Sequence, residues 1–257
     1  MKITILTLFP EFFQSFLASS IIGRSISRGL VTISVVNIRA YSKDKNHRVD
    51  DHSLGGGAGL IMKMEPLVDC LRDNSGPKAR KILLSPWGKT YDQQKALELK
   101  DQSEIVLVCG HYEGVDSRFV DYVDEMVSLG DYVMTGGEIG AMAIADSVIR
   151  LLKGAISEDS TTEESFNGGL LEYPQYTYPL NYEGHQVPEV LLSGNHEAVA
   201  HFRRRESFRL TQTYRPDLLN NFSYSKSDRK ILEEIAQGSE SRLEKQAKIK
   251  GARFLNK

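Results

Sequence analysis

Residues 128–141, SLGDYVMTGGEIGA, place four glycines around a short apolar run, immediately before a helical pattern. The glycines are Gly130, Gly136, Gly137 and Gly140. Glycine loses more backbone freedom on folding than any other residue, so a cluster of this kind is costly to order. It indicates either backbone angles that other residues avoid or a backbone that another group approaches closely.

Apolar runs rich in β-branched residues alternate with helical patterns along this part of the chain. We predict strands at residues 3–9, 31–38, 81–84, 104–109 and 125–129. We predict helices at residues 11–29, 64–74, 90–100, 117–123 and 138–153. This alternation predicts an α/β fold, with a mostly parallel sheet covered by helices on both faces.

Three of the predicted strands end in glycine-containing loops. SPWGK follows the strand at 81–84, GHYEG follows the strand at 104–109, and GDYVMTGGEIG follows the last strand. The carboxyl ends of parallel strands share one edge of the sheet, where open α/β sheets bind ligands. We therefore expect the backbone of these loops to close around a small molecule.

An adenosyl group without phosphates is the ligand that these loops suit best. SPWGKT ends like the phosphate-binding pattern GxxxxGK[ST], but Leu83 replaces its first glycine and Pro86 interrupts the row of amide donors. A dinucleotide fold needs GxGxxG after the first strand, which here runs into FPEFF. Tyr112, Glu113 and the apolar Leu129 offer no cation to receive phosphates.

Composition is that of a globular protein of the cytoplasm. Of the 257 residues, 40% are hydrophobic, which is enough to fill a core. The early apolar run at 3–9 stops at Pro10, far short of the ~20 residues that span a bilayer, so we expect no contact with a membrane. Cys70 and Cys109 form no CxxC pair, which fits a reducing compartment.

The character of the chain changes after residue 156. Residues 157–165, SEDSTTEES, are polar and acidic, and helical patterns follow at 188–192, 197–210, 216–221 and 227–236. We predict a first domain at 1–156, a linker at 157–170 and a small helical domain at 171–257. The charged residues 240–257 are expected to form a frayed or solvent-exposed helix.

The segment HFRRRESFR, residues 201–209, mixes cations with aromatic rings. Its arginines are Arg203, Arg204, Arg205 and Arg209. This mixture suits a phosphate backbone and unstacked bases, although a solvated helix face with two core phenylalanines would have the same pattern. The formal net charge of −2 argues against a general polyanion binder.

Seven motifs in one order resemble the bacterial tRNA (guanine-37-N1)-methyltransferases. They are LFPEFF (8–13), VDDHSLGGGAGL (49–60), LLSPWGK (83–89), CGHYEGVDSR (109–118), SLGDYVMTGGEIGAMAIADSVIR (128–150), SFNGGLLEYPQYTYP (165–179) and EVLLSGNHEAV (189–199). The resemblance extends from the first strand to about residue 235.

The resemblance implies properties that composition cannot give. It implies a SPOUT-type α/β domain with a deep trefoil knot made by the three loops, a C-terminal helical domain that binds tRNA, and an obligate homodimer whose active sites are shared between subunits. It implies S-adenosylmethionine as the methyl donor. The residues expected to hold it are Leu83, Leu84, Ser85, Pro86, Gly88, Gly110, Tyr112, Glu113, Gly114, Leu129, Gly130, Tyr132, Met134, Gly136, Gly137 and Gly140.

The implied reaction transfers a methyl group to N1 of guanine 37 in tRNA. N1 carries a proton in the neutral base, so a base must remove it and a cation must stabilise the charge that spreads to O6. By resemblance these residues are Glu164 and Arg150. The family usually has Asp at the first position, so neighbouring Glu163 is a rival and an ordinary linker role is an alternative.

Other departures from the family pattern concern tRNA and metal binding. Gln175 stands where His is common, Tyr178 replaces an Arg that could contact phosphate, and Gly140 replaces a frequent Pro. The loss of that Arg places more of the expected tRNA affinity on Arg203, Arg204 and Arg205.

The segment HRVDDHSLGGGAG, residues 47–59, contains histidines and carboxylates without a clean ligand spacing. We expect no resident metal there, and instead a glycine loop that meets tRNA or the second subunit. A transient Mg²⁺ near the guanine would help N1 lose its proton.

Two other functions stay open at this point. The same knotted fold could methylate another RNA position or a ribose hydroxyl. A protein that binds RNA without turnover would explain the departures at Glu164 and Tyr178.

Overall fold

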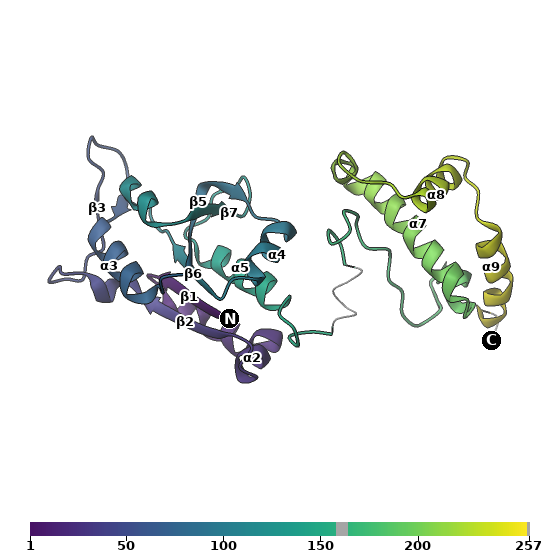
Figure 1. Cartoon of the computed structure of the whole chain (residues 1–257), viewed down its shortest axis with the longest axis horizontal. Helices are drawn as coiled ribbons and strands as arrows, with labels where there is room; N and C mark the ends of the chain where they lie inside the picture. Colours follow the sequence, from purple (N-terminus) through teal and green to yellow (C-terminus); the bar gives the residue numbers. More distant parts are fainter. Residues whose placement is uncertain (158–163, 256–257) are drawn as a thin grey trace. The chain divides into compact units, whose positions relative to one another are not determined.

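The computed structural model describes residues 1–157 and 164–255. The chain forms two compact units, Met1–Glu158 and Asp159–Lys257, and each is described by itself (Figure 1). Residues 158–163 of the predicted linker, including Glu163, lie outside the described residues.

A five-stranded parallel sheet forms the centre of the first unit, in the order β2-β1-β6-β5-β7. The prediction of an α/β fold with a parallel sheet is therefore confirmed. In the central pairings Ile3 of β1 lies opposite both Ile33 of β2 and Ile105 of β6. The strands are β1 (Lys2–Thr7), β2 (Thr32–Asn37), β5 (Arg80–Thr90), β6 (Glu104–Cys109) and β7 (Glu125–Ser128).

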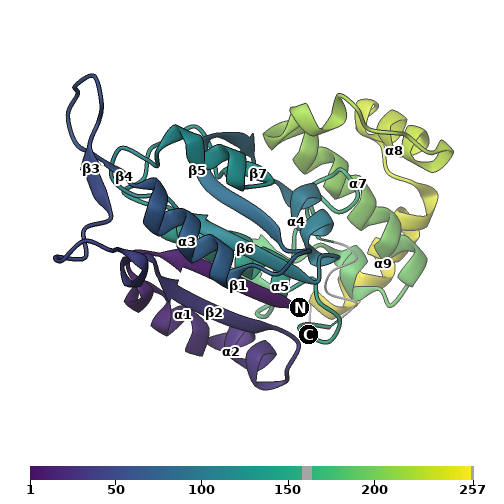
Figure 2. The same cartoon turned by 60° about the vertical axis from the view of Figure 1, so that its left-hand side comes forward.

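Two hydrophobic cores cover the two faces of this sheet, because side chains alternate along each strand. On β6, Ile105 and Leu107 belong to one core, and Val106 and Val108 belong to the other. Helices α2 (Ser20–Ser27), α4 (Gln93–Lys100) and α5 (Glu138–Ile149) contribute to the first core. Helix α3 (Met64–Asn74) and the 3-10 helix η3 (Ser117–Tyr122) contribute to the second, and Figure 2 shows α3 in front of the sheet.

Strand β5 continues through the segment SPWGKT, where a loop was predicted. Val127 of β7 is paired in parallel with both Leu84 and Lys89 of β5. A residue of a strand has one neighbour on each side, so the chain between Leu84 and Lys89 must cross β7. Gly88 lies at this crossing, where an added Cβ would collide with the backbone of Met126 and Val127.

The largest difference from prediction lies at residues 11–29, where one helix was expected. The structure has the 3-10 helix η1 (Pro10–Phe13), then α1 (Gln14–Ala18) and α2. The break falls at Ser20, whose φ of 46° is incompatible with a continuous right-handed helix. The predicted helix at 117–123 is the 3-10 helix η3.

A hairpin that the sequence patterns did not indicate projects from the first unit (Figure 2). It consists of β3 (Asp50–His52) and β4 (Leu60–Met62), joined by the glycine-rich segment of residues 55–59. The 3-10 helix η2 (Ile38–Tyr41) precedes it. Backbone hydrogen bonds tie the hairpin to the segment after β6: Met62 N donates to Gly114 O at 3.0 Å, and Asp116 N donates to Met62 O at 3.0 Å.

Helices dominate the second unit. They are η4 (Glu189–Leu192), α7 (His196–Tyr214), η5 (Pro216–Leu219), α8 (Lys226–Ala236) and α9 (Arg242–Leu255). A small hairpin, β8 (Asn181–Tyr182) with β9 (His185–Gln186), precedes them. Leu170, at the end of the predicted linker, is buried with Phe208 of α7 and Ile231 of α8.

Helix α9 is packed into the second unit, and the prediction of a frayed or solvent-exposed helix is wrong for one of its faces. Ala247 joins a buried cluster with Phe202 and Val190. Gly251 lies directly against the backbone of Glu189. Glu244 is fully buried, and it is held by His201 Nδ1 at 2.7 Å from its Oε1 and by Arg205.

No helix within the described residues is long and apolar enough to cross a membrane.

Candidate active site

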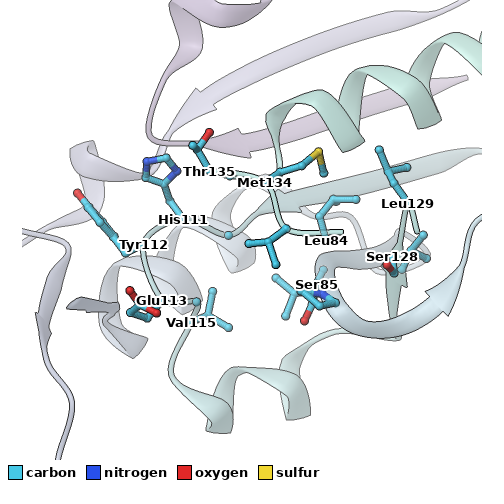
Figure 3. A pocket seen from close by; sticks show the side chains of 18 of the residues that line it. Leu84, Ser85, His111, Tyr112, Glu113, Val115, Ser128, Leu129, Met134 and Thr135 are labelled. Atoms are coloured by element: carbon cyan, nitrogen blue, oxygen red, sulfur yellow. The ribbon is translucent and has the colours of Figure 1, made fainter. Parts of the chain in front are cut away.

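The middle of β5 and the glycine-containing segments after β6 and β7 meet around one cavity of about 220 Å³ (Figure 3). His111, Tyr112 and Glu113 lie toward one end, and Ser128 and Leu129 lie toward the other (Figure 3). The cavity is lined by Leu83, Leu84, Ser85, Pro86, Gly110, His111, Tyr112, Glu113, Gly114, Val115, Val127, Ser128, Leu129, Gly130, Tyr132, Val133, Met134, Thr135, Gly136 and Gly137. The structure thus brings together all of the predicted donor-binding residues except Gly88 and Gly140.

Both exceptions lie just outside the cavity because they serve chain packing. Gly88 is placed against the backbone of β7 at the crossing of the two strands. An added Cβ at Gly140 would lie 3.0 Å from Leu84 Cδ1 and 3.6 Å from Leu129 Cγ, so this glycine seats α5 against two lining residues.

The segments after β6 and β7 are bonded to each other. Gly137 N donates to Gly110 O at 2.9 Å, and His111 pairs with Gly136 in an antiparallel bridge. A Cβ at Gly137 would come within 2.8 Å of Cys109 Cα, so only glycine allows this approach. Gly136 and Gly137 therefore let the two loops meet, Gly140 seats α5, and Gly130, with a φ of 157°, is the one of the four with an unusual backbone angle.

The cavity lining contains no lysine or arginine among the described residues. Among the lining residues that the structure describes, Glu113 is the only acidic one, and its side chain lies against Gly59 of the hairpin segment. Arg39 approaches only the rim, where its Nη2 donates to the hydroxyl of Tyr112 at 3.2 Å. Such a cavity suits a ligand that carries no phosphate groups.

A buried polar group lies beneath the cavity at the start of α5. Glu138 is 5% exposed, and its Oε1 accepts a hydrogen bond from Thr7 Oγ1 at 2.8 Å. Burial, followed by the negative charge of Glu138, raises the pKa of the Cys109 thiol well above its ordinary value. Cys109 therefore stays a neutral thiol at the end of β6 and is not a nucleophile.

The sequence prediction did not include His111, Val115, Val127, Ser128, Val133 and Thr135 among the lining residues. These residues could have been predicted, because they lie inside the motifs at 109–118 and 128–150 or directly beside them. His111 Nδ1 is buried and has no hydrogen-bond partner within the described part of the chain. It lies close to the position that a Cβ of Gly136 would take.

The two predicted catalytic residues lie in different units. Arg150 directly follows the last residue of α5, and its N–H donates to Asp146 O at 3.0 Å. Thirteen residues separate it from Gly137 at the cavity, which corresponds to about 20 Å along a helix. Glu164 lines a cavity of about 300 Å³ in the second unit, together with Tyr173, His196 and Arg203.

The predicted tRNA-binding arginines of α7 are largely engaged within the second unit. Arg204 Nε donates to Asp228 Oδ1 at 2.9 Å, and Arg209 lies 3.7 Å from Glu206. The Arg203 guanidinium stacks over the Tyr173 ring at 4.5 Å from its centroid.

Arg205 requires a correction, because it is 4% exposed and its guanidinium is paired with Glu244 and Glu206. A cation in this position stabilises the helical unit and cannot reach a phosphate. Of the four predicted tRNA-binding arginines, Arg205 is therefore buried in the helical unit, whereas the other three remain at least partly exposed.

No group of three or more His, Cys, Asp or Glu side chains suitable for a metal ion occurs among residues 1–157 and 164–255. In the histidine-containing segment 47–59, Asp51 lies 3.4 Å from Lys63 Nζ. The backbone N–H of His52 and the Lys63 ammonium lower the pKa of Asp51, which is therefore an ordinary exposed carboxylate.

The fold and the cavity define a class: an α/β protein with a cavity at the carboxyl edge of a parallel sheet that suits a small ligand without phosphates. Comparison with known families gives a more specific result. The family model described as tRNA (Guanine-1)-methyltransferase TrmD matches residues 1–221. The chain belongs to this family, and the resemblance inferred from its motifs is confirmed.

Individual relatives agree with the family match. A tRNA (guanine-N(1)-)-methyltransferase of Clostridium novyi (strain NT) is 49% identical over 235 residues, which cover 91% of this chain and 97% of the relative. Proteins of the same name from Malacoplasma penetrans (strain HF-2) and Clostridium perfringens (strain SM101 / Type A) are 49% and 48% identical, over 85% and 90% of this chain and 96% and 99% of their own lengths.

Proposed function

We propose that this protein transfers a methyl group from S-adenosylmethionine to N1 of guanine 37 in tRNA, beside the anticodon. The observation that carries the proposal is the junction of the three motif segments around one cavity in a chain of the tRNA (Guanine-1)-methyltransferase family.

The cavity fits the methyl donor in chemistry. S-adenosylmethionine has an adenine, a ribose and an amino-acid end but no phosphate, and when bound it supplies a methyl group on a positively charged sulfur. The lining offers backbone groups of Gly110 and Leu129 and the carboxylate of Glu113, without a competing cation. Glu113 is the charged lining residue available to a positively charged ligand.

Glu164 and Arg150 would act on the guanine. A carboxylate that accepts the N1 proton leaves a nitrogen lone pair able to attack the methyl carbon. A guanidinium beside O6 stabilises the negative charge that develops there, mainly in the transition state. Glu164 lines a cavity of about 300 Å³ together with Tyr173 and Arg203, and these residues offer polar groups to a base.

A trefoil knot in the first unit is part of the proposal. Its support is the path of β5, which runs on one side of β7 at Leu84 and on the other at Lys89. The chain leaves this segment, forms α4 and β6, and returns as β7 between the two halves. A strand that returns through a loop closed earlier in the chain is the arrangement that a knot requires.

A homodimer with shared active sites explains the position of Arg150. Its place at the far end of α5, about 20 Å along the helix from Gly137, supports a role at the cavity of another chain. A second copy of the chain could bring its own Arg150 and Glu164 to this cavity. The first unit would then bind the donor, and the helical unit, residues 171–257, would bind tRNA.

The proposal also includes a transient Mg²⁺ that assists the reaction. A cation near O6 would favour loss of the N1 proton. A cytoplasmic location is also part of the proposal, because the proposed substrate is tRNA.

The test uses labelled S-adenosylmethionine and two tRNA transcripts that differ only in carrying guanine or adenine at position 37. We expect label in the guanine transcript alone, and digestion to nucleosides should place it on the base. Equal labelling of both transcripts would indicate another position, and label on a ribose would indicate the alternative chemistry. No labelling of either transcript, with tRNA binding intact, would leave an RNA-binding protein.

A further inference from the structure

Helix α9 presents a strip of unpaired cations to solvent. Arg242, Lys245, Lys250 and Arg253 are exposed, and none of them has an ion pair with another described residue. Glu244 is the only acidic residue of the helix, and it is fully buried. The outward face of α9 therefore carries positive charge alone, on a chain whose formal net charge is −2.

The four cations lie on one side of the helix. At about 100° per residue they fall within an arc of roughly 140°, opposite the buried Ala247 and Gly251. From Arg242 to Arg253 the strip is about 17 Å long. Its length and single sign suit successive phosphates of a nucleic acid strand.

The strip has a fixed position in the second unit because the opposite face of α9 is packed against its neighbours. Glu244 is held by His201 and Arg205 of α7, and Gly251 lies against the backbone of Glu189. A surface on such a helix presents its charges without first having to fold. This lowers the entropic cost of binding a partner.

The arginines of α7 do not offer an equivalent surface. Arg204 is engaged by Asp228, Arg205 by Glu244, and Arg209 lies beside Glu206. Acidic partners thus offset the charge of the cluster that the sequence pattern favoured. Glu244, the carboxylate that pairs with the buried Arg205, belongs to α9, the helix that also carries the unpaired cations.

We propose that the outward face of α9, formed by Arg242, Lys245, Lys250 and Arg253, binds the phosphate backbone of the tRNA substrate. This proposal rests on the proposed function, since it takes tRNA as the polyanion. It concerns a helix beyond residue 221, where the match to the family model ends. The face contributes affinity and leaves the chemistry of the bound guanine unchanged.

The test is a variant in which glutamine replaces all four residues: R242Q, K245Q, K250Q and R253Q. Because each phosphate contact contributes about 0.7 to 0.9 to the slope of log K against log salt, we expect the slope for tRNA binding to fall by about three. The KM for tRNA should rise, while the single-turnover rate at saturating tRNA stays that of the wild type. Circular dichroism checks that the helical content is retained.

A second variant controls for the loss of four positive charges. It replaces ion-paired lysines by glutamine at Lys2, Lys43, Lys100 and Lys248, whose partners are Glu104, Asp69, Asp101 and Glu240. We expect a slope close to that of the wild type, because these cations are already neutralised.

The outcomes separate the two proposals. If the wild type methylates tRNA and the α9 variant keeps the wild-type slope, the face is only solvated and the α9 proposal is overturned. If both variants lose slope equally, net charge is responsible and the proposal is again overturned. If the wild type binds tRNA without methylating it, the proposed function fails, and the slope still decides whether α9 binds tRNA.

Discussion

Glu164 is the residue on which the proposed chemistry depends most, and its side chain is one methylene longer than the Asp usual in the family. We expect Glu164→Gln to lower the single-turnover rate of methyl transfer by about 10²- to 10⁴-fold, because an amide cannot accept the N1 proton. Glu164→Asp should retain more activity than the Gln variant. A matched control is Glu172→Gln, a nearby carboxylate that accepts a hydrogen bond from Gln175. A Glu164→Gln enzyme as fast as the control variant would remove Glu164 from the mechanism.

Glu244 contributes to the stability of the second unit through its buried ion pair with Arg205. Glu244→Ala leaves the Arg205 guanidinium buried without its main partner, and we expect a loss of about 3 to 5 kcal/mol in the free energy of unfolding. Glu240→Ala is the control, since Glu240 pairs with Lys248 at the surface, where ion pairs contribute about 1 kcal/mol or less. Urea unfolding, followed by helical circular dichroism, measures both. Similar losses in the two variants would contradict the role given to the buried pair.

The close approach of β5 and β7 at their crossing can be tested by adding one methyl group at Gly88. Gly88→Ala places a Cβ into the backbone of Met126 and Val127, so we expect a loss of about 3 kcal/mol or more, or failure to fold. Gly110→Ala is the control in the same unit, because its nearest atom would be Leu84 O at an ordinary 3.5 Å. Thermal unfolding compares the two. A Gly88→Ala protein as stable as the control would show that the two backbones are not in close contact.

The strands could be predicted from the sequence because burial on both faces leaves continuous apolar runs such as residues 104–109. The motif segments likewise predicted fourteen of the twenty lining residues of the cavity. The break at Ser20 could not be predicted, since a positive φ at a serine has no sequence signal. Arg205 was misjudged because its partner Glu244 is 39 residues away, and only the packing of α9 brings the two together.

At the scale of the whole molecule, a shared active site predicts complementation between two inactive chains. Glu164→Gln removes the base, and Gly110→Leu extends a side chain from a lining position of the donor cavity. In a mixed dimer one site carries both changes and the other carries neither. We therefore expect about half of the wild-type turnover per mixed dimer. The two chains would carry different tags so that only mixed dimers are purified, and absence of turnover would mean that each chain contains its own complete site.

The donor cavity itself is tested most directly by isothermal titration calorimetry with S-adenosylhomocysteine and, separately, with ATP. Both ligands contain adenosine, but ATP carries phosphates for which the lining has no cation. We predict heat of binding for S-adenosylhomocysteine with the wild type, none for ATP, and none for either ligand with Gly110→Leu. Binding of ATP in preference to S-adenosylhomocysteine, or no heat from a folded wild-type protein with the latter, would contradict the assignment of this cavity to the methyl donor.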